Sequence, residues 1–138
     1  MNIEKVYSRQ EPSLLLHILV DAKGFIEQRQ DLTPAEQWLQ VSLIPLVAGT
    51  KIQAHIHQER QANIPKATIT QESWFVVRGS IVVRLYDLDK TAIHEGKLDE
   101  GGMLITFHGG HSMEALHGGA VVMETKNGPY SGKDFVRI

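Results

Sequence analysis

Apolar and polar residues alternate with a period of two along much of the chain, and other runs are continuous stretches of aliphatic and β-branched residues. Both patterns are typical of β-strands with one or both faces buried. Strands are predicted over residues 14–20, 40–47, 51–57, 72–77, 81–87, 102–107, 111–116, 120–126 and 134–138. Turn-forming Gly-Gly, Arg-Gly and Asn-Gly pairs lie between them, so the pattern predicts an all-β sandwich or barrel.

Helical signals are sparse. The segment Thr33-Pro34-Ala35-Glu36 places a capping residue before a proline and an acid, which predicts a single short helical turn. The most apolar strand, residues 14–20, is interrupted by His17 and is far shorter than a membrane-spanning helix. The polar amino terminus has no secretion-signal pattern, so we expect a cytoplasmic protein without a membrane partner.

Composition narrows the possible functions. A chain of 138 residues predicts one domain. The 14 Lys and Arg residues against 16 Asp and Glu residues give a net charge of −2, which makes nucleic acid an unfavourable partner. There is no cysteine, so disulfides, thiolate nucleophiles and cysteine metal sites are excluded.

The main chemical signal is the pair His55 and His57. Residues two apart on a strand point to the same face, so both imidazoles can contribute to one metal site. A His-x-His pair by itself is more often a pair of surface or hydrogen-bonded histidines. Further residues favour the metal interpretation: Gly49 lies six positions before His55, and Glu72 is followed by Gly79.

This order resembles the first motif of the cupin superfamily, in which a glycine, five residues and His-x-His precede a glutamate and a later glycine. The second cupin motif is similar to Gly101-Gly102, the segment MLITF, and His108-Gly109-Gly110 before His111. The chain departs from the family pattern in both motifs, and the second motif is also about one residue short and has Ala115 where an asparagine is often found. Residues 58–71 form a longer insertion before the glutamate, and His108-Gly109-Gly110 replaces a Pro-x-Gly sequence. The resemblance covers residues 38–126.

The resemblance implies an all-β double-stranded β-helix, the cupin jelly-roll barrel, with an extra N-terminal strand. Residues 1–37, with that strand and the short helical turn, would pack on a barrel of residues 38–138. Small cupins commonly dimerise. Because residues 14–20 are too apolar for a free edge strand, we expect a homodimer in which a second subunit covers them.

The resemblance also implies that His55, His57, Glu72 and His111 bind one divalent metal ion, and Fe, Mn, Ni, Co or Zn suits this ligand set. The chain is similar to small cupins of bacterial surface-polysaccharide and nucleotide-sugar gene clusters. We expect a metal-dependent enzyme, such as an isomerase, epimerase or dioxygenase, acting on a sugar, keto acid or other small chelating molecule. The alternative is a non-catalytic metal-binding or ligand-binding module.

Other residues have competing interpretations. Glu59 could replace Glu72 as the carboxylate ligand, and Gln71 is predicted to be a surface residue facing away from Glu72. Arg60, in the long insertion, is a candidate to bind a phosphate or carboxylate. Trp74 and His108 are candidates to line the substrate cavity, because Trp74 shares the face of Glu72 and His108 precedes the Gly-Gly turn.

The remaining histidines and the large apolar side chains have ordinary interpretations. We expect His17, His94 and His117 to be partly exposed or hydrogen-bonded residues outside the site. Core positions are predicted for Met103, Met113, Met123, Trp38 and Phe107, and a core position is the alternative to the cavity role for Trp74.

Overall fold

The computed structural model describes residues 1–21, 27–46, 48–51, 53, 69–127 and 138. These residues form an all-β structure without a helix. The strands are β1 (Asn2–Tyr7), β2 (Leu15–Asp21), β3 (Gln30–Asp31), β4 (Ser42–Leu43), β5 (Glu72–Tyr86), β6 (Ala92–Asp99), β7 (Gly102–Thr106) and β8 (Gly110–Lys126). At the expected helical turn, Gln37 N donates a hydrogen bond to Pro34 O at 3.1 Å, which closes one isolated turn. The strands predicted over residues 51–57 and 134–138 lie almost wholly outside the described residues.

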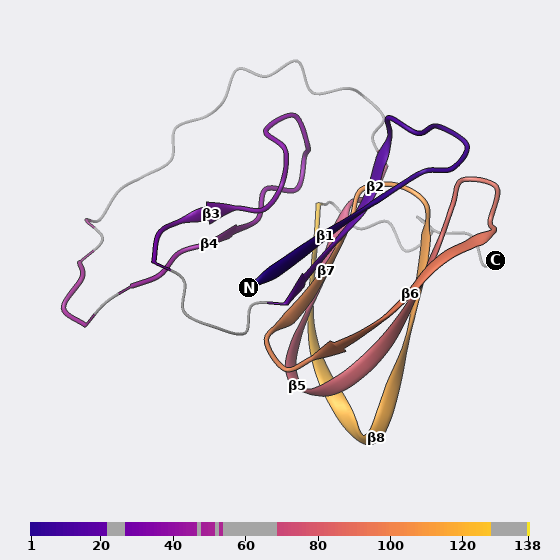
Figure 1. Cartoon of the computed structure of the whole chain (residues 1–138). Coiled ribbons are helices and arrows are strands. Elements are labelled where there is room, and N and C mark those ends of the chain that lie inside the picture. The colour runs from indigo at the N-terminus through magenta and orange to yellow at the C-terminus, as the bar shows by residue number, and fades with distance from the viewer. Residues whose placement is uncertain (22–26, 47, 52, 54–68, 128–137) are drawn as a thin grey trace.

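The main sheet is antiparallel and strongly curled, so that it forms half of a barrel (Figure 1). Its strand order is β1-β2-β7-β5-β6, and β8 pairs with β5 along nearly the whole length of that strand. Strands β3 and β4 form a separate two-stranded ribbon. The strand prediction is therefore confirmed at the level of an all-β, barrel-like architecture.

Strands β5 and β8 are each longer than the sequence predicted. Residues 72–77 and 81–87 were expected to be separate strands with a turn at Arg78-Gly79, but they form one continuous strand with irregular register near Gly79. Gly79 has a φ of +81°, and it lies so close to β8 that a Cβ atom there would be 2.3 Å from Gly119 O. The glycine thus marks a bulge and a close approach of two backbones, not a chain reversal.

Two strands of the main sheet were missed because their sequences are mainly polar. β1 (NIEKVY) and β6 (AIHEGKLD) lie at the two ends of the strand order and remain largely exposed. Edge strands bury less apolar surface than central strands, so their apolar periodicity is weak. Their positions are decided by backbone pairing with β2 and β5.

The sheet has an apolar cluster on each face. One face, called the pocket face below, carries a cluster of Leu19, Trp74, Val76, Ile81, Val83, Leu85, Leu98 and Leu104. The opposite face carries Ile18, Val20, Leu32, Ile105 and Phe107, with partly buried Leu39, Val41 and Leu43 packed against them. Because the segment around β4 covers this opposite face, β2 and β7 are apolar on both sides.

This arrangement changes the argument for a dimer. β2 pairs with β1 on one edge and with β7 on the other, so residues 14–20 have no free edge that a second subunit would need to cover. Residues of the same chain already cover both faces of β2. The homodimer stays a prediction, but β2 no longer supports it.

Several expected core residues are exposed. Relative exposure is 40% for Met113, 53% for Met123 and 44% for Trp38, so their predicted core positions are wrong in this chain. Met113 and Met123 belong to β8, which pairs only with β5 among the described residues. Phe107 is fully buried, and Met103 packs against the core of the opposite face.

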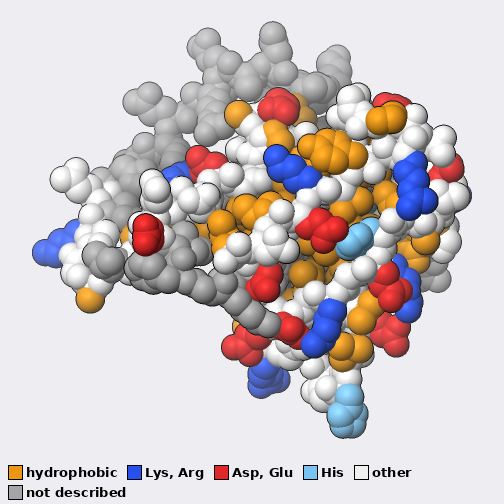
Figure 2. Space-filling model, viewed as in Figure 1, with side chains coloured by type: hydrophobic (Ala, Val, Ile, Leu, Met, Phe, Trp, Pro, Cys, Tyr) orange, Lys and Arg blue, Asp and Glu red, His pale blue; other side chains and the backbone are white. Residues whose placement is uncertain are grey.

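The described residues contain no helix that is long and apolar enough to cross a membrane. On the face shown in Figure 2, acidic and basic side chains are interspersed.

Asp87 connects the loop after β1 to the end of β5. Its buried carboxylate accepts hydrogen bonds from Ser8 Oγ at 2.6 Å, Arg9 N at 2.6 Å and Leu88 N at 2.7 Å. Burial acts to raise the pKa of this carboxyl, but the hydrogen bonds outweigh burial and hold the pKa below 3.8. The ionised carboxylate is therefore the form that the fold stabilises.

We expect Asp87→Asn to lower the melting temperature at neutral pH, because the amide has a single acceptor oxygen and adds an NH₂ group among donors. A carboxyl with a depressed folded-state pKa contributes stability above its unfolded value and loses it as the pH falls through the folded value. The difference between wild type and variant should therefore shrink below pH 3.8. Thermal melts across this range measure it. Asp89→Asn in the same turn is exposed and is the matched control; an equal loss in both variants would contradict the prediction.

Candidate functional site

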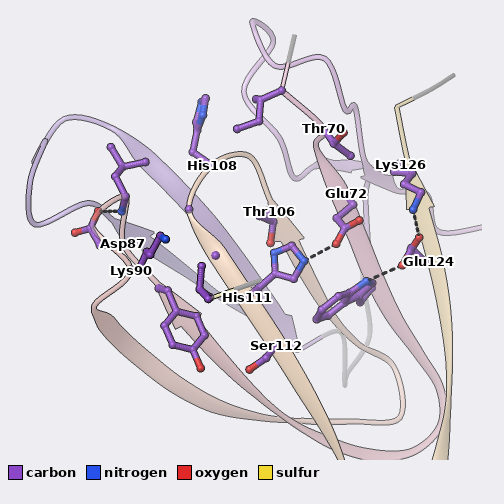
Figure 3. Close-up of a pocket in the computed structure, with 17 residues that line it drawn as sticks. Thr70, Glu72, Asp87, Lys90, Thr106, His108, His111, Ser112, Glu124 and Lys126 are labelled. Carbon is purple, nitrogen blue, oxygen red and sulfur yellow. Dashed lines mark hydrogen bonds and ion pairs between the residues drawn. The ribbon is translucent and has the colours of Figure 1, made fainter. Parts of the chain in front are cut away.

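A pocket with a volume of about 790 Å³ opens on the pocket face of the curled sheet (Figure 3). Its walls come from the start of β5, the ends of β5 and β7, both ends of β8, and the turn at His108–Gly110. Apolar side chains of Ile69, Leu88 and Ile138 also line it. This volume is in the range of pockets that bind small molecules.

Glu72 and His111 meet at the wall of this pocket. Glu72 Oε1 and His111 Nε2 are 2.5 Å apart, and the two side chains are 15% and 19% exposed. Glu72 begins β5 and His111 lies at the start of β8. The contact therefore joins an acceptor carboxylate to an imidazole that can carry a proton or bind a metal ion.

The contact depends on the curl of the β5–β8 ribbon. In the strand register His111 is opposite Leu85, whereas Glu72 is opposite Lys126 at the other end of the ribbon. In a flat ribbon, thirteen residues at about 3.3 Å each would separate Glu72 from His111 by roughly 40 Å. Curling the ribbon brings its two ends together and places both side chains at one pocket wall.

Trp74 supports the imidazole from the side. The rings of Trp74 and His111 meet edge to face, with centroids 4.4 Å apart and planes at 89°. Trp74 Nε1 donates a hydrogen bond to Glu124 Oε2 at 3.3 Å, and Glu124 pairs with Lys126 at 2.8 Å. The hydrogen bond from Lys126 lowers the pKa of the Glu124 carboxyl. These contacts hold the indole against His111.

The carboxylate of Glu72 and the imidazole of His111 are groups of the kind that bind metal ions, and they are two of the four expected ligands. Among residues 69–127 and the other described positions, no group of three or more His, Asp or Glu side chains could hold a metal. Glu72 and His111 supply one oxygen and one nitrogen donor. The buried Nδ1 atom of His111 has no hydrogen-bond partner among the described residues, so it can still bind a further group.

Four of the predicted site residues lie together in this pocket: Glu72, His111, Trp74 and His108. His55, His57, Glu59 and Arg60 lie outside the described residues. The structure thus places the carboxylate and one imidazole of the expected metal site beside the two expected cavity-lining residues.

Gln71 does not join the pocket, but it is not a surface residue as predicted. It is 3% exposed, its Oε1 accepts a hydrogen bond from Leu39 N at 2.9 Å, and its Nε2 donates to Gln37 Oε1 at 2.7 Å. Its side chain points away from Glu72, as the strand periodicity predicts, but that face is covered by residues 37–39. His94 lies away from this pocket, with its Nδ1 3.5 Å from Glu4 Oε1.

Sequence reasoning missed Thr106 and Lys126 as pocket residues. Both are register partners of Glu72, Thr106 on β7 and Lys126 on β8, and both line the pocket. The available signal was parity, because Thr106 is a polar residue two positions after Leu104 and therefore faces the same side of the sheet. The register that aligns these residues with Glu72 cannot be obtained from parity alone.

Comparisons of the chain with protein-family models, with curated proteins and with solved structures found no match.

Proposed function

We propose that this protein is a metal-binding cupin, a jelly-roll barrel in which His55, His57, Glu72 and His111 hold one divalent metal ion. The observation that supports the proposal is the contact of Glu72 with His111 at the wall of a pocket of about 790 Å³. Two residues taken from separate motifs meet at one point, which is what a shared metal site requires. His55-x-His57 supplies the remaining donors in this proposal.

The ligand chemistry suits Fe, Mn, Ni, Co or Zn, since three imidazoles and one carboxylate are borderline and hard donors. A metal ion in such a site polarises a bound carbonyl or lowers the pKa of a bound hydroxyl group. The protein side chains have separate tasks. Glu72 adds negative charge, and Trp74 holds the His111 ring and excludes water from one side.

The proposed activity is metal-dependent conversion of a small chelating molecule, such as a sugar or keto acid, by isomerisation, epimerisation or oxidation with dioxygen. An open pocket directly beside Glu72 and His111 favours this activity, because a substrate has room next to the ligands. A non-catalytic metal-binding module is the second candidate. A role in surface-polysaccharide metabolism and a homodimer belong to the proposal through the family resemblance.

Metal analysis of the purified full chain tests the proposal. We expect about one divalent metal ion per chain after loading, with metal-dependent turnover in a panel of sugars and keto acids. Ligand binding without turnover, and equal behaviour with different metals, would favour the module. A chain that retains no divalent metal under any loading condition would overturn both versions.

A further inference from the structure

A row of polar side chains crosses the pocket face beside Glu72. His17 on β2 is the register partner of Thr106 on β7, Thr106 is the partner of Glu72 on β5, and Glu72 is the partner of Lys126 on β8. Directly paired residues place their side chains on the same face. The next row along the same face consists of Leu19, Leu104, Trp74 and Glu124. The polar row thus lies next to a row that is apolar except for Glu124 at its end.

His17 is an unusual residue for its position. It is fully buried, and the neighbouring residues of β2 from Leu15 to Val20 are all aliphatic. Burying an imidazole costs free energy that a leucine at the same position would not cost. Its one side-chain partner is specific: His17 Nδ1 lies 3.1 Å from Thr106 Oγ1.

His17 lies behind the pocket wall instead of in it. Thr106 and Gly109 line the pocket, and a Cβ atom on Gly109 would be 3.2 Å from His17 Nε2. Burial, followed by the nearby His111, lowers the pKa of His17 to about 4, so the ring is neutral at physiological pH. A neutral ring between Thr106 and the Gly109 turn acts as a fixed hydrogen-bond partner and not as a counter-ion.

Thr106 can bind a ligand while it contacts His17. A threonine hydroxyl has one hydrogen to donate and two lone pairs, so the bond with His17 uses only part of this capacity. Thr106 is 3% exposed, and this small exposed part lines the pocket next to Glu72 and His111 (Figure 3). Neighbouring strands are about 4.8 Å apart, so a group bound at Glu72 and a group bound at Thr106 would be separated by roughly 5 Å.

We propose that Thr106 is a ligand-binding residue of this pocket and that His17 is the positioning residue that orients its hydroxyl. The ligand class is a small molecule with two oxygen functions about one strand spacing apart, such as a polyhydroxy acid. One function binds at Glu72 and His111, and the other accepts or donates a hydrogen bond at Thr106. The binding position of the first oxygen-containing group rests on the proposed metal site. The binding position at Thr106 rests on the described residues alone.

The test compares two probe acids on the Mn²⁺-loaded full chain by titration calorimetry. Glycolate has one hydroxy-carboxylate group, whereas tartrate has the same group and a second one beyond it. We expect Thr106→Val, which keeps the side-chain shape, to weaken tartrate binding about five- to ten-fold, the effect of one lost hydrogen bond. Binding of glycolate and of Mn²⁺ should change less than two-fold.

Further variants separate positioning from structural damage. His17→Leu should weaken tartrate binding as Thr106→Val does, and the double variant should be no weaker than either single variant. His17→Asn, whose amide can reach Thr106, should recover most of the affinity. Thr125→Val is the matched control, because it removes a cross-strand contact of 2.7 Å to Ser73 Oγ that lies outside the pocket lining.

The outcomes distinguish this inference from the proposed function. Equal tartrate binding by wild type and Thr106→Val, or no tartrate binding by the Mn²⁺-loaded wild type, overturns the inference and leaves the metal site intact. Failure to bind Mn²⁺ and each of the other candidate divalent metals overturns the proposed function instead. In that case tartrate is titrated into the metal-free chain, where the same loss in Thr106→Val is expected and its absence overturns the inference.

Discussion

Replacement of Gly79 by alanine is expected to lower the free energy of unfolding by about 3 kcal/mol and the melting temperature by about 10 °C. Two physical causes add. The φ of +81° is unfavourable for a residue with a Cβ atom, at a cost of about 1–2 kcal/mol. In addition, that Cβ atom would lie 2.3 Å from Gly119 O and 3.1 Å from the Cα atom of Ala120. Both contacts are with backbone, so β5 and β8 would have to move apart.

Gly101→Ala is the matched control for this prediction. Gly101 has a φ of +84°, close to that of Gly79, but an added Cβ atom would meet nothing within 4 Å. Only the backbone cost of about 1–2 kcal/mol is expected there. Chemical denaturation of both variants separates the two contributions. A loss in Gly79→Ala no greater than that in Gly101→Ala would contradict the close approach of β5 and β8.

Replacement of His111 by alanine is expected to reduce the affinity for a divalent metal by about 100-fold or more. Changes to residues that only support metal ligands cost about 10–100-fold, and loss of a ligand exceeds this range. His57→Ala should give a comparable loss, since both imidazoles belong to the proposed site. Equilibrium dialysis with Mn²⁺ or Co²⁺ measures the affinity, and a thermal melt confirms that each variant is folded.

Two comparisons make this result specific. His94→Ala removes a histidine that lies away from the pocket and close to Glu4, so it should keep the metal affinity of the wild type. Glu72→Gln and Glu59→Gln distinguish the two possible carboxylate ligands, with the large loss expected for Glu72→Gln. Unchanged metal content in both His57→Ala and His111→Ala would remove the metal assignment.

Parity explains which parts of the site were predictable. Glu72 and Trp74 are two residues apart on one strand, so the sequence alone places them on one face, and both line the pocket. The same reasoning put Gln71 on the other face correctly. It failed on burial, because it cannot show that residues 37–39 cover that face. Whether a second layer packs on a strand depends on chain segments far away in sequence.

The period-two pattern of the sequence determined by itself that this protein is all-β and that the apolar segments at residues 14–20 and 102–107 are strands. It also determined which residues share a face of each strand, since side chains alternate with a period of two whatever the surroundings. The pairing of strands, their continuity through Gly79, and the burial of His17 were decided only in the tertiary structure. So was the contact between Glu72 and His111. Their separation of roughly 40 Å in a flat ribbon becomes 2.5 Å because the sheet curls, and curl is a property of the whole sheet.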